Sequence, residues 1–310
     1  MDSFGDRLYK KVDSQRFQLF IQGELAELTY QAYQLSISTI SNGDSETIEV
    51  TYPVGYKADK TFISNTQTYA KKDLIARYEY LGSSQMPING VYQLVTIVEI
   101  LLVDILRDIL LEFPNKIPNK RKIDAELVLE SGSLDEVKNL IISSLINKLN
   151  YKSPREFAEE FEKYTGIKLL EQPAFHKYIE LKATRDVYIH NSGTANSIYL
   201  NKAGTLSRVR IGEFLPVTIQ YFLESYECCL QLTEVIDSLL NKIWPSEAYQ
   251  KAQEKYKANK EEQQRAAVEE VIKKNEAPTS AEEIKDTSKP KKKRKLPLSK
   301  APSASKNSQA

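Results

Sequence analysis

The longest apolar run in this 310-residue chain extends from Val91 to Leu111 and reads VYQLVTIVEILLVDILRDILL. Its length is that of a membrane span, because about 20 apolar residues cross a bilayer as a helix. Four charged residues interrupt the run: Glu99, Asp104, Arg107 and Asp108. Since charged side chains are costly at the centre of a bilayer, we expect instead a long buried helix of a soluble protein, with no membrane partner.

The spacing of apolar residues and the residues that begin and end helices predict an all-α fold. Ser133 followed by Glu136 forms a capping box, Pro154 stands at a first helical position, and Gly166 and Gly193 mark helix ends. The expected helices cover residues 14–40, 65–81, 89–113, 133–148, 153–166, 173–191, 211–244 and 246–274, with a kink near Pro216 and a loop or small hairpin at 41–60. Short turns between the helices favour an up-and-down bundle.

These patterns divide the chain into an N-terminal helical region with the loop or hairpin (1–83), a helical domain (84–245), a charged exposed helix (246–274) and a disordered basic tail (275–310). From Lys285 onward nine residues are basic and one is acidic, whereas the preceding 284 residues hold 34 basic and 41 acidic ones.

The tail run Lys289–Leu296 is similar to a nuclear localisation signal. We favour instead a tail that holds RNA or an acidic partner by charge. The N-terminus, MDSFGDRLYKK, has no apolar signal region, so we expect a cytoplasmic protein.

One segment, KATRDVYIHNSG at residues 182–193, gathers residue types suited to catalysis. Arg185 carries a permanent charge that suits phosphate binding, and His190 is the side-chain type that gains and loses a proton near neutral pH. Five residues along a helix turn it by about 140° net, so the two side chains do not share a face, but Gly193 lets the helix unwind at His190. Asp186, four residues before His190, can reach the imidazole from the preceding turn and fix its tautomer.

This segment resembles the HEPN family of helical-bundle proteins, whose nuclease members carry the pattern R-(N/D/H)-x(3–5)-H. The pattern here runs from Arg185 through Asp186 to His190, and the following Asn191-x-Gly193 and Tyr199-Leu200 are similar to its context in several HEPN branches, the RiboL-PSP branch among them. The apolar helix with Glu99 and the capped helix from Ser133 resemble the preceding helices of that family. The resemblance covers residues 84–245.

The resemblance implies a metal-independent endoribonuclease with no cofactor, in which two protomers bring their Arg–His segments together along a two-fold cleft. His190 would act as general base or acid, Arg185 would stabilise charge on the phosphorane, and Asp186 would orient His190. Further contacts to RNA would come from Lys182, Tyr188, Asn191 and Tyr199, with the tyrosines stacking on bases. The products would be 2′,3′-cyclic phosphate and 5′-hydroxyl ends. The family also implies a toxin or antiviral defence effector, with a cognate antitoxin or defence partner protein.

Simpler interpretations exist for the same residues. His190 can cap carbonyls at a helix end, Arg185 can pair with Asp186 or Glu180, and HEPN members without catalysis bind RNA or a partner protein. Glu99 is expected to pair with Arg185 or another cation rather than to catalyse, since buried acids are rare without a partner. A helical adaptor whose charged segment after residue 246 recruits other proteins is a third alternative.

The remaining titratable candidates have structural explanations. Cys228 and Cys229 are expected to be buried thiols, and two cysteines with two distant histidines cannot form a structural zinc site. His176 lies fourteen residues before His190, about 21 Å along a helix, so we expect a surface or partly buried residue outside the site.

Overall fold

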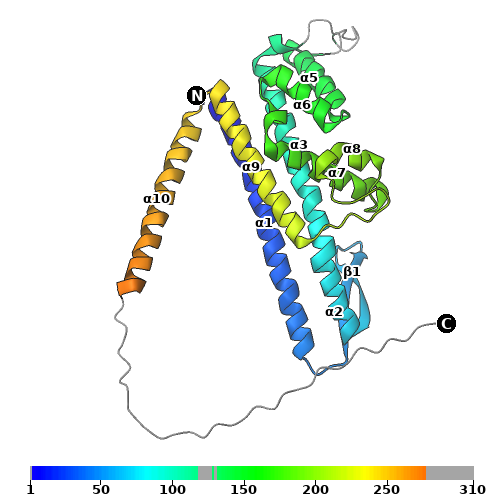
Figure 1. The fold of residues 1–310 in the computed structure, drawn as a ribbon. Coiled ribbons are helices and arrows are strands. Elements are labelled where there is room, and N and C mark those ends of the chain that lie inside the picture. Colours follow the sequence, from blue (N-terminus) through cyan, green and yellow to red (C-terminus); the bar gives the residue numbers. More distant parts are fainter. Residues whose placement is uncertain (1, 118–127, 129–130, 277–310) are drawn as a thin grey trace, which may run out of the picture. The chain divides into compact units, whose positions relative to one another are not determined.

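The computed structural model describes residues 2–117, 128 and 131–276, and these are mainly helical (Figure 1). The all-α prediction is confirmed, with a two-stranded hairpin as the only sheet among the described residues. The chain divides into two compact units, Met1–Lys255 and Tyr256–Ala310. From residue 277 onward the predicted basic tail lies outside the described residues.

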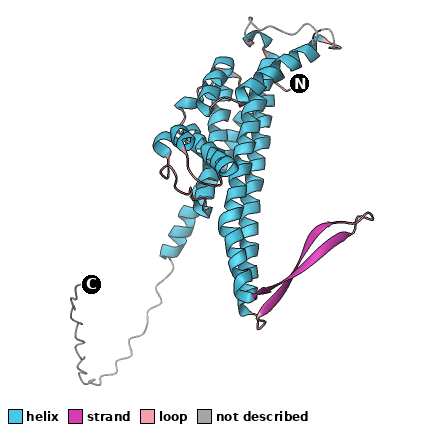
Figure 2. Cartoon of the chain, turned by 90° about the vertical axis from the view of Figure 1, so that its right-hand side faces the viewer, coloured by secondary structure: helices cyan, strands magenta, loops and turns pink. Residues whose placement is uncertain are grey.

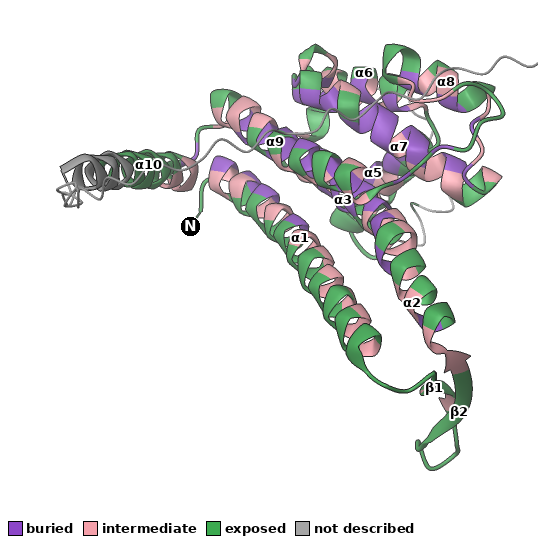
Figure 3. Cartoon of the chain, turned by 60° about the horizontal axis from the view of Figure 1, so that its bottom comes forward, coloured by how far each residue is buried: buried purple, intermediate pink, exposed green. Residues whose placement is uncertain are grey.

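Three long helices make the main core of the first unit: α1 (Phe4–Asn42), α3 (Met86–Glu112) and α9 (Ile219–Ile243). Each packs against the other two, and the buried parts of α1 lie in its N-terminal half (Figure 3). Leu8 and Val12 of α1 belong to the same buried cluster as the apolar face of α3. No helix within the described ranges is long and apolar enough to cross a membrane.

The charged residues of the apolar run all find partners on neighbouring elements. Asp108 lies 2.8 Å from Lys11 of α1, and Asp104 lies 3.9 Å from the same ammonium group. Arg107 donates a 3.1 Å hydrogen bond to Ser143 Oγ. Because each charge has a partner, the long apolar helix can carry charged residues and still pack in the bundle.

The hairpin extends further along the chain than predicted. β1 (Thr47–Tyr56) pairs antiparallel with β2 (Phe62–Ala70), in the register Thr47↔Ala70 with an irregularity between Pro53 and Gly55 (Figure 2). The helix expected from residue 65 is therefore wrong in its first part and begins at Lys71. Cross-strand pairs explain the difference, because Thr51 and Thr66 hydroxyls lie 2.9 Å apart and such pairs stabilise strands.

Helix α2 (Lys71–Tyr80) continues through a π-helical turn (Leu81–Gln85) into α3. The boundary predicted between residues 83 and 84 therefore falls inside a continuous helical stretch. Gly82 lies in this turn, and a Cβ on it would come within 2.8 Å of the Tyr33 ring of α1. A π-turn with a glycine thus lets α1 approach closely at this point.

A second group of helices packs on α3: α5 (Leu134–Asn150), α6 (Pro154–Thr165) and α7 (Pro173–Asn191). At the start of α6, Ser153 and Glu156 form a complete capping box. At the start of α5, Ser133 accepts from Glu136 N, but the Glu136 carboxylate accepts from Gly132 N, so that predicted box is only half formed. Helix α6 ends at Gly166, whose φ of 79° is left-handed.

Residues 197–218 differ from the prediction. A short helix, α8 (Ser197–Ala203), lies in the expected loop, and α9 begins only at Ile219, after the N-cap Thr218. Ile211 and Phe214, which were expected in this helix, lie in the preceding loop and are exposed. Pro216 precedes α9 instead of kinking it, since the residue before a proline disfavours helical dihedrals.

The remaining expectations concern single residues and the C-terminal helix. Cys228 and Cys229 are buried free thiols of α9. His176 is partly buried, with its Nε2 2.8 Å from the Leu170 carbonyl oxygen. Helix α10 (Glu247–Glu276) forms where the charged helix was predicted.

Candidate functional site

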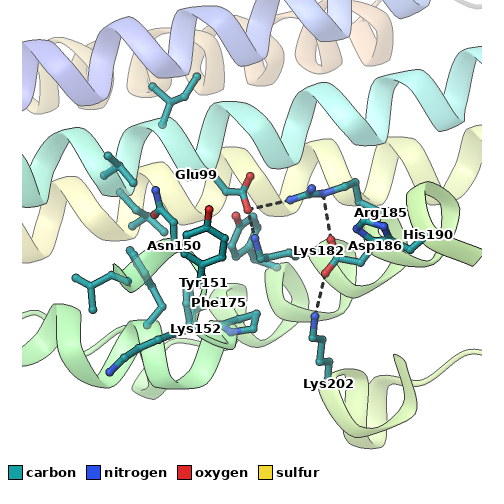
Figure 4. A pocket seen from close by; sticks show the side chains of 17 residues that line it. Glu99, Asn150, Tyr151, Lys152, Phe175, Lys182, Arg185, Asp186, His190 and Lys202 are labelled. Carbon is teal, nitrogen blue, oxygen red and sulfur yellow. Dashed lines mark hydrogen bonds and ion pairs between the residues drawn. The ribbon is translucent and has the colours of Figure 1, made fainter. Parts of the chain in front are cut away.

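Helix α7 carries the Arg185–His190 segment along one wall of a pocket of about 690 Å³ (Figure 4). The opposite wall comes from α3, and the ends come from the α5–α6 connection and from α8. Its lining comprises Glu99, Ile100, Leu102, Val103, Leu149, Asn150, Tyr151, Lys152, Pro154, Phe157, Phe175, Tyr178, Lys182, Arg185, Asp186, His190 and Lys202.

The structure brings Arg185 and His190 to the same pocket although their positions on an ideal helix diverge by about 140°. The helix expected to unwind at His190 instead stays regular through Asn191, and the left-handed dihedrals of Ser192 (φ 48°) and Gly193 (φ 81°) end it there. The imidazole is exposed and makes no hydrogen bond to any part of the chain that the structure describes. A ring in this position is accessible to a bound molecule.

The cations of the pocket are held by two carboxylates. Arg185 Nη2 donates a 2.9 Å hydrogen bond to Glu99 Oε1, and the Lys182 ammonium contacts the same oxygen. Arg185 Nε lies 3.4 Å from Asp186 Oδ1, and Lys202 Nζ donates to Asp186 Oδ2 at 2.9 Å. The predicted pairing of Glu99 with Arg185 is confirmed.

Lys152 adds a fourth cation to the lining, but its ammonium pairs with Glu160 of α6 at 3.2 Å. The other three cations face the two carboxylates of Glu99 and Asp186, so with a neutral imidazole they keep a surplus of one positive charge. A partly enclosed site of this kind attracts an anion more strongly than an exposed surface would, because solvent screens it less.

Burial changes the proton affinities of two groups at the site. Desolvation, helped by the Arg185 and Lys202 charges and opposed by Asp186, lowers the pKa of Lys182 to about 8. Desolvation also raises the pKa of Tyr178 above its usual range, and its buried hydroxyl has no hydrogen-bond partner in the described structure. The phenol therefore stays protonated and keeps an unused donor beside the cations.

The predicted role of Asp186 has no direct geometric support. Both of its oxygens face cations, Arg185 and Lys202, and no hydrogen bond joins it to His190 in the described ranges. Asp186 thus positions two cations of the pocket in this structure.

The residues predicted to contact RNA fall in different environments. Lys182 lines the pocket, whereas the Asn191 amide donates to the Thr194 carbonyl and ties down the turn after α7. The Tyr188 hydroxyl donates to the Leu215 carbonyl at 2.6 Å, and its ring packs on Phe214.

The prediction that Tyr199 stacks on an RNA base is wrong. Its side chain is 1% exposed, and its hydroxyl donates to Glu180 Oε1 at 2.9 Å. A ring enclosed in the core offers no face on which a base can stack, so Tyr199 supports the fold instead.

Sequence reasoning missed the network to which Tyr199 belongs. Buried Glu180 of α7 faces Arg208 at 3.1 Å and also accepts from Thr184 and Tyr221. The Arg208 guanidinium lies 3.6 Å from the centre of the Tyr221 ring. This network fastens the loop before α9 to α7. The one available signal was a glutamate among apolar neighbours on α7, which requires a partner.

No group of three or more metal-ligating side chains occurs among residues 2–117, 128 and 131–276. A comparison of this chain with protein-family models, curated proteins and solved structures finds no match.

Proposed function

We propose that this chain is a metal-independent endoribonuclease that cleaves RNA at the α7 pocket. The observation that carries the proposal is the exposed, unpartnered imidazole of His190 on the same pocket as the cations Lys182, Arg185 and Lys202. A phosphodiester needs a group that moves protons and a group that stabilises negative charge, and this pocket supplies both.

In this mechanism His190 removes the proton from a ribose 2′-hydroxyl, and the 2′-oxygen forms a bond to phosphorus. The bond from phosphorus to the 5′-oxygen breaks, and that oxygen leaves with a proton. Arg185 and Lys182 stabilise the charge that builds on the phosphoryl oxygens. The products carry 2′,3′-cyclic phosphate and 5′-hydroxyl ends, and DNA is not cut because it lacks the nucleophile.

A phosphate bound in the pocket must share its hydrogen-bond donors with the Glu99 carboxylate. Its carboxylate already contacts Arg185 and Lys182, so a bound phosphate competes with Glu99 for these two donors. A guanidinium has five donors and can serve both anions, whereas the lysine ammonium is the easier of the two to redirect.

We propose that the active form is a homodimer. The chemistry needs a base for the 2′-hydroxyl and an acid for the 5′-oxygen, yet His190 is the single histidine on the pocket. A second copy supplies the second imidazole. Exposed apolar side chains on the segments that adjoin His190, namely Ile189, Ile198, Ile211 and Phe214, support a protein contact there. From the HEPN resemblance we further propose cytoplasmic action as a toxin or defence effector with a partner that controls it.

A non-catalytic module that binds RNA or a protein is the second candidate. The observation that favours it is the missing carboxylate beside His190, since both Asp186 oxygens are engaged by cations. A base without an orienting group is a weaker catalyst.

The test is cleavage of an end-labelled RNA by the full chain in EDTA. We expect wild type to cut RNA to cyclic phosphate ends, and His190→Ala and Arg185→Ala each to lose at least about a hundredfold in rate. His176→Ala, on the same helix but outside the pocket, is the matched control and keeps the rate. Cleavage that survives in His190→Ala rejects the mechanism, and RNA binding without cleavage by any form selects the non-catalytic module.

A further inference from the structure

The pocket continues beyond Lys182, Arg185 and Lys202 toward the α5–α6 connection, where Lys152 also lines it. The apolar lining of this end comes from Ile100 and Val103 of α3, Leu149 at the end of α5, and Phe157 of α6. The total volume of about 690 Å³ lies within the range of sites that enclose a whole small ligand. A phosphate group bound at the cations would therefore leave the apolar part empty.

Polar groups stand at defined points of this apolar part. Asn150, at the last position of α5, is exposed and presents an amide that both donates and accepts, and no hydrogen bond of its side chain to the described chain occurs. The buried Tyr178 hydroxyl is likewise without a partner. Tyr151 stands at the rim with 93% of its surface exposed, which is unusual for a large ring unless something covers it.

We infer that this end of the pocket is a nucleobase subsite, which takes the base next to the phosphate bound by Arg185 and Lys182. The inference rests on the proposed function for the identity of the ligand. A base is flat and apolar on its faces and has donors and acceptors along its edge, so it matches an apolar lining with an amide at its margin. Tyr151 stacks on the base from the rim, as aromatic side chains do in single-stranded RNA recognition.

The polar groups distinguish a base from a purely apolar group. A hydrocarbon chain in this position would bury the Asn150 amide without a partner, which is costly. A base edge satisfies the amide. The subsite thus gives the chain a preference among RNA sequences, since different bases present different edges to Asn150.

The experiment compares two fluorescent hexaribonucleotides that differ by an abasic residue at every second position. Binding is measured with the full chain carrying His190→Ala, so that neither probe is cut. We expect the intact probe to bind at least about tenfold more tightly than the abasic probe, which corresponds to about 1.4 kcal/mol. Adding Asn150→Ala and Tyr151→Ala together reduces this ratio to below about threefold. Tyr56→Ala, an exposed ring of the hairpin, is the matched control and preserves the ratio.

The outcomes separate this inference from the proposed function, because cleavage by the unmodified chain is measured in parallel. A tenfold ratio that depends on Asn150 and Tyr151 supports the subsite even when no form cuts RNA. If the unmodified chain cuts RNA but both probes bind equally, the subsite is rejected and the nuclease proposal is retained. A ratio unchanged by the double substitution places the base elsewhere and also overturns the inference. Failure of both probes to bind overturns the subsite, and together with absence of cleavage by the unmodified chain it overturns both proposals.

Discussion

Arg185 of α7 donates a 2.9 Å hydrogen bond to the carboxylate of Glu99, which lies near the middle of α3. The contact joins the site helix to the most apolar helix of the bundle, and it uses the same oxygen that Lys182 contacts. An internal carboxylate therefore neutralises part of the charge that the pocket offers to an anion. Glu99 both positions these cations and limits their availability.

We expect Glu99→Gln to bind RNA about three- to tenfold more tightly at moderate salt, because Arg185 and Lys182 lose the competing anion. The slope of log Kd against log salt concentration becomes steeper, by an amount that corresponds to about one more phosphate contact. Fluorescence anisotropy in the His190→Ala background measures both quantities. Glu112→Gln is the matched control, since Glu112 pairs with Arg7 at 2.5 Å at the far end of the same helix. If the His190→Ala chain binds RNA with equal affinity with and without Glu99→Gln, Glu99 does not compete with the phosphate.

The lowered pKa of Lys182, about 8, predicts a pH dependence of RNA binding. Lys182 is charged below this pH and loses its proton above it, so affinity falls about three- to tenfold between pH 7 and pH 9.5. Desolvation by burial is the main cause of this lowered pKa, the Arg185 and Lys202 charges lower it further, and Asp186 opposes the shift, as the contact with Glu99 does. Lys182→Arg abolishes this fall because a guanidinium stays charged throughout.

The control for this titration is Lys177→Arg, on the same helix but outside the pocket's lining, which keeps the wild-type profile. A profile as steep in Lys182→Arg as in wild type would exclude Lys182 as the group responsible. The same pKa shift acts on stability in the opposite direction to its effect on RNA affinity. Between pH 8 and 10.5 the unfolded chain binds more protons at Lys182, so this group's contribution to the free energy of unfolding rises with pH.

Local signals predicted local structure well in this chain. Ser153 before Pro154 begins a helix, and the Asn191–Gly193 turn ends one, because caps and left-handed residues act within a few positions. The pairing of Glu99 with Arg185 also followed from a simple rule, since an acid in an apolar helix needs a cation.

Contacts between distant segments were not predictable in the same way. Phe17, Leu25 and Leu28 lie within the helix predicted over residues 14–40, yet these side chains are exposed, and Leu8 and Leu19 are buried instead. Periodicity defines an apolar stripe but does not determine which face meets the rest of the fold. Nor does any local pattern link Glu180 to Arg208, which is 28 residues away.

We expect Glu180→Gln to lower the free energy of unfolding by about 3 kcal/mol, because Arg208 then lacks its buried counter-charge. Arg208→Met has a similar effect, and the double variant loses clearly less than the sum of the two. Urea unfolding measures all three. Glu171→Gln, which breaks an exposed pair with Lys168, is the control and has little effect on stability. Strict additivity of the two substitutions would show that the residues do not act as a pair.

The pair between Arg16 of α1 and Asp237 of α9 predicts a stability change that depends on pH. Desolvation raises the pKa of Asp237 from 3.8 to about 6, although Arg16 and its hydrogen bond act to lower it. The folded chain therefore binds more protons than the unfolded chain between these two values. The contribution of Asp237 to stability falls as the pH rises through this window.

Arg16→Met removes the charge that opposes this shift, so the pKa of Asp237 in the folded chain rises further. At pH 8 the carboxylate is then buried without a counter-charge, and we expect a loss of about 3 kcal/mol. At pH 5 the carboxyl group stays protonated, and the loss falls to about 1 kcal/mol. Lys10→Met, which breaks an exposed pair with Asp2, is the control and has little effect at either pH. Equal losses for Arg16→Met at pH 5 and pH 8 would show that packing of the Arg16 side chain, and not its charge, holds α1 against α9.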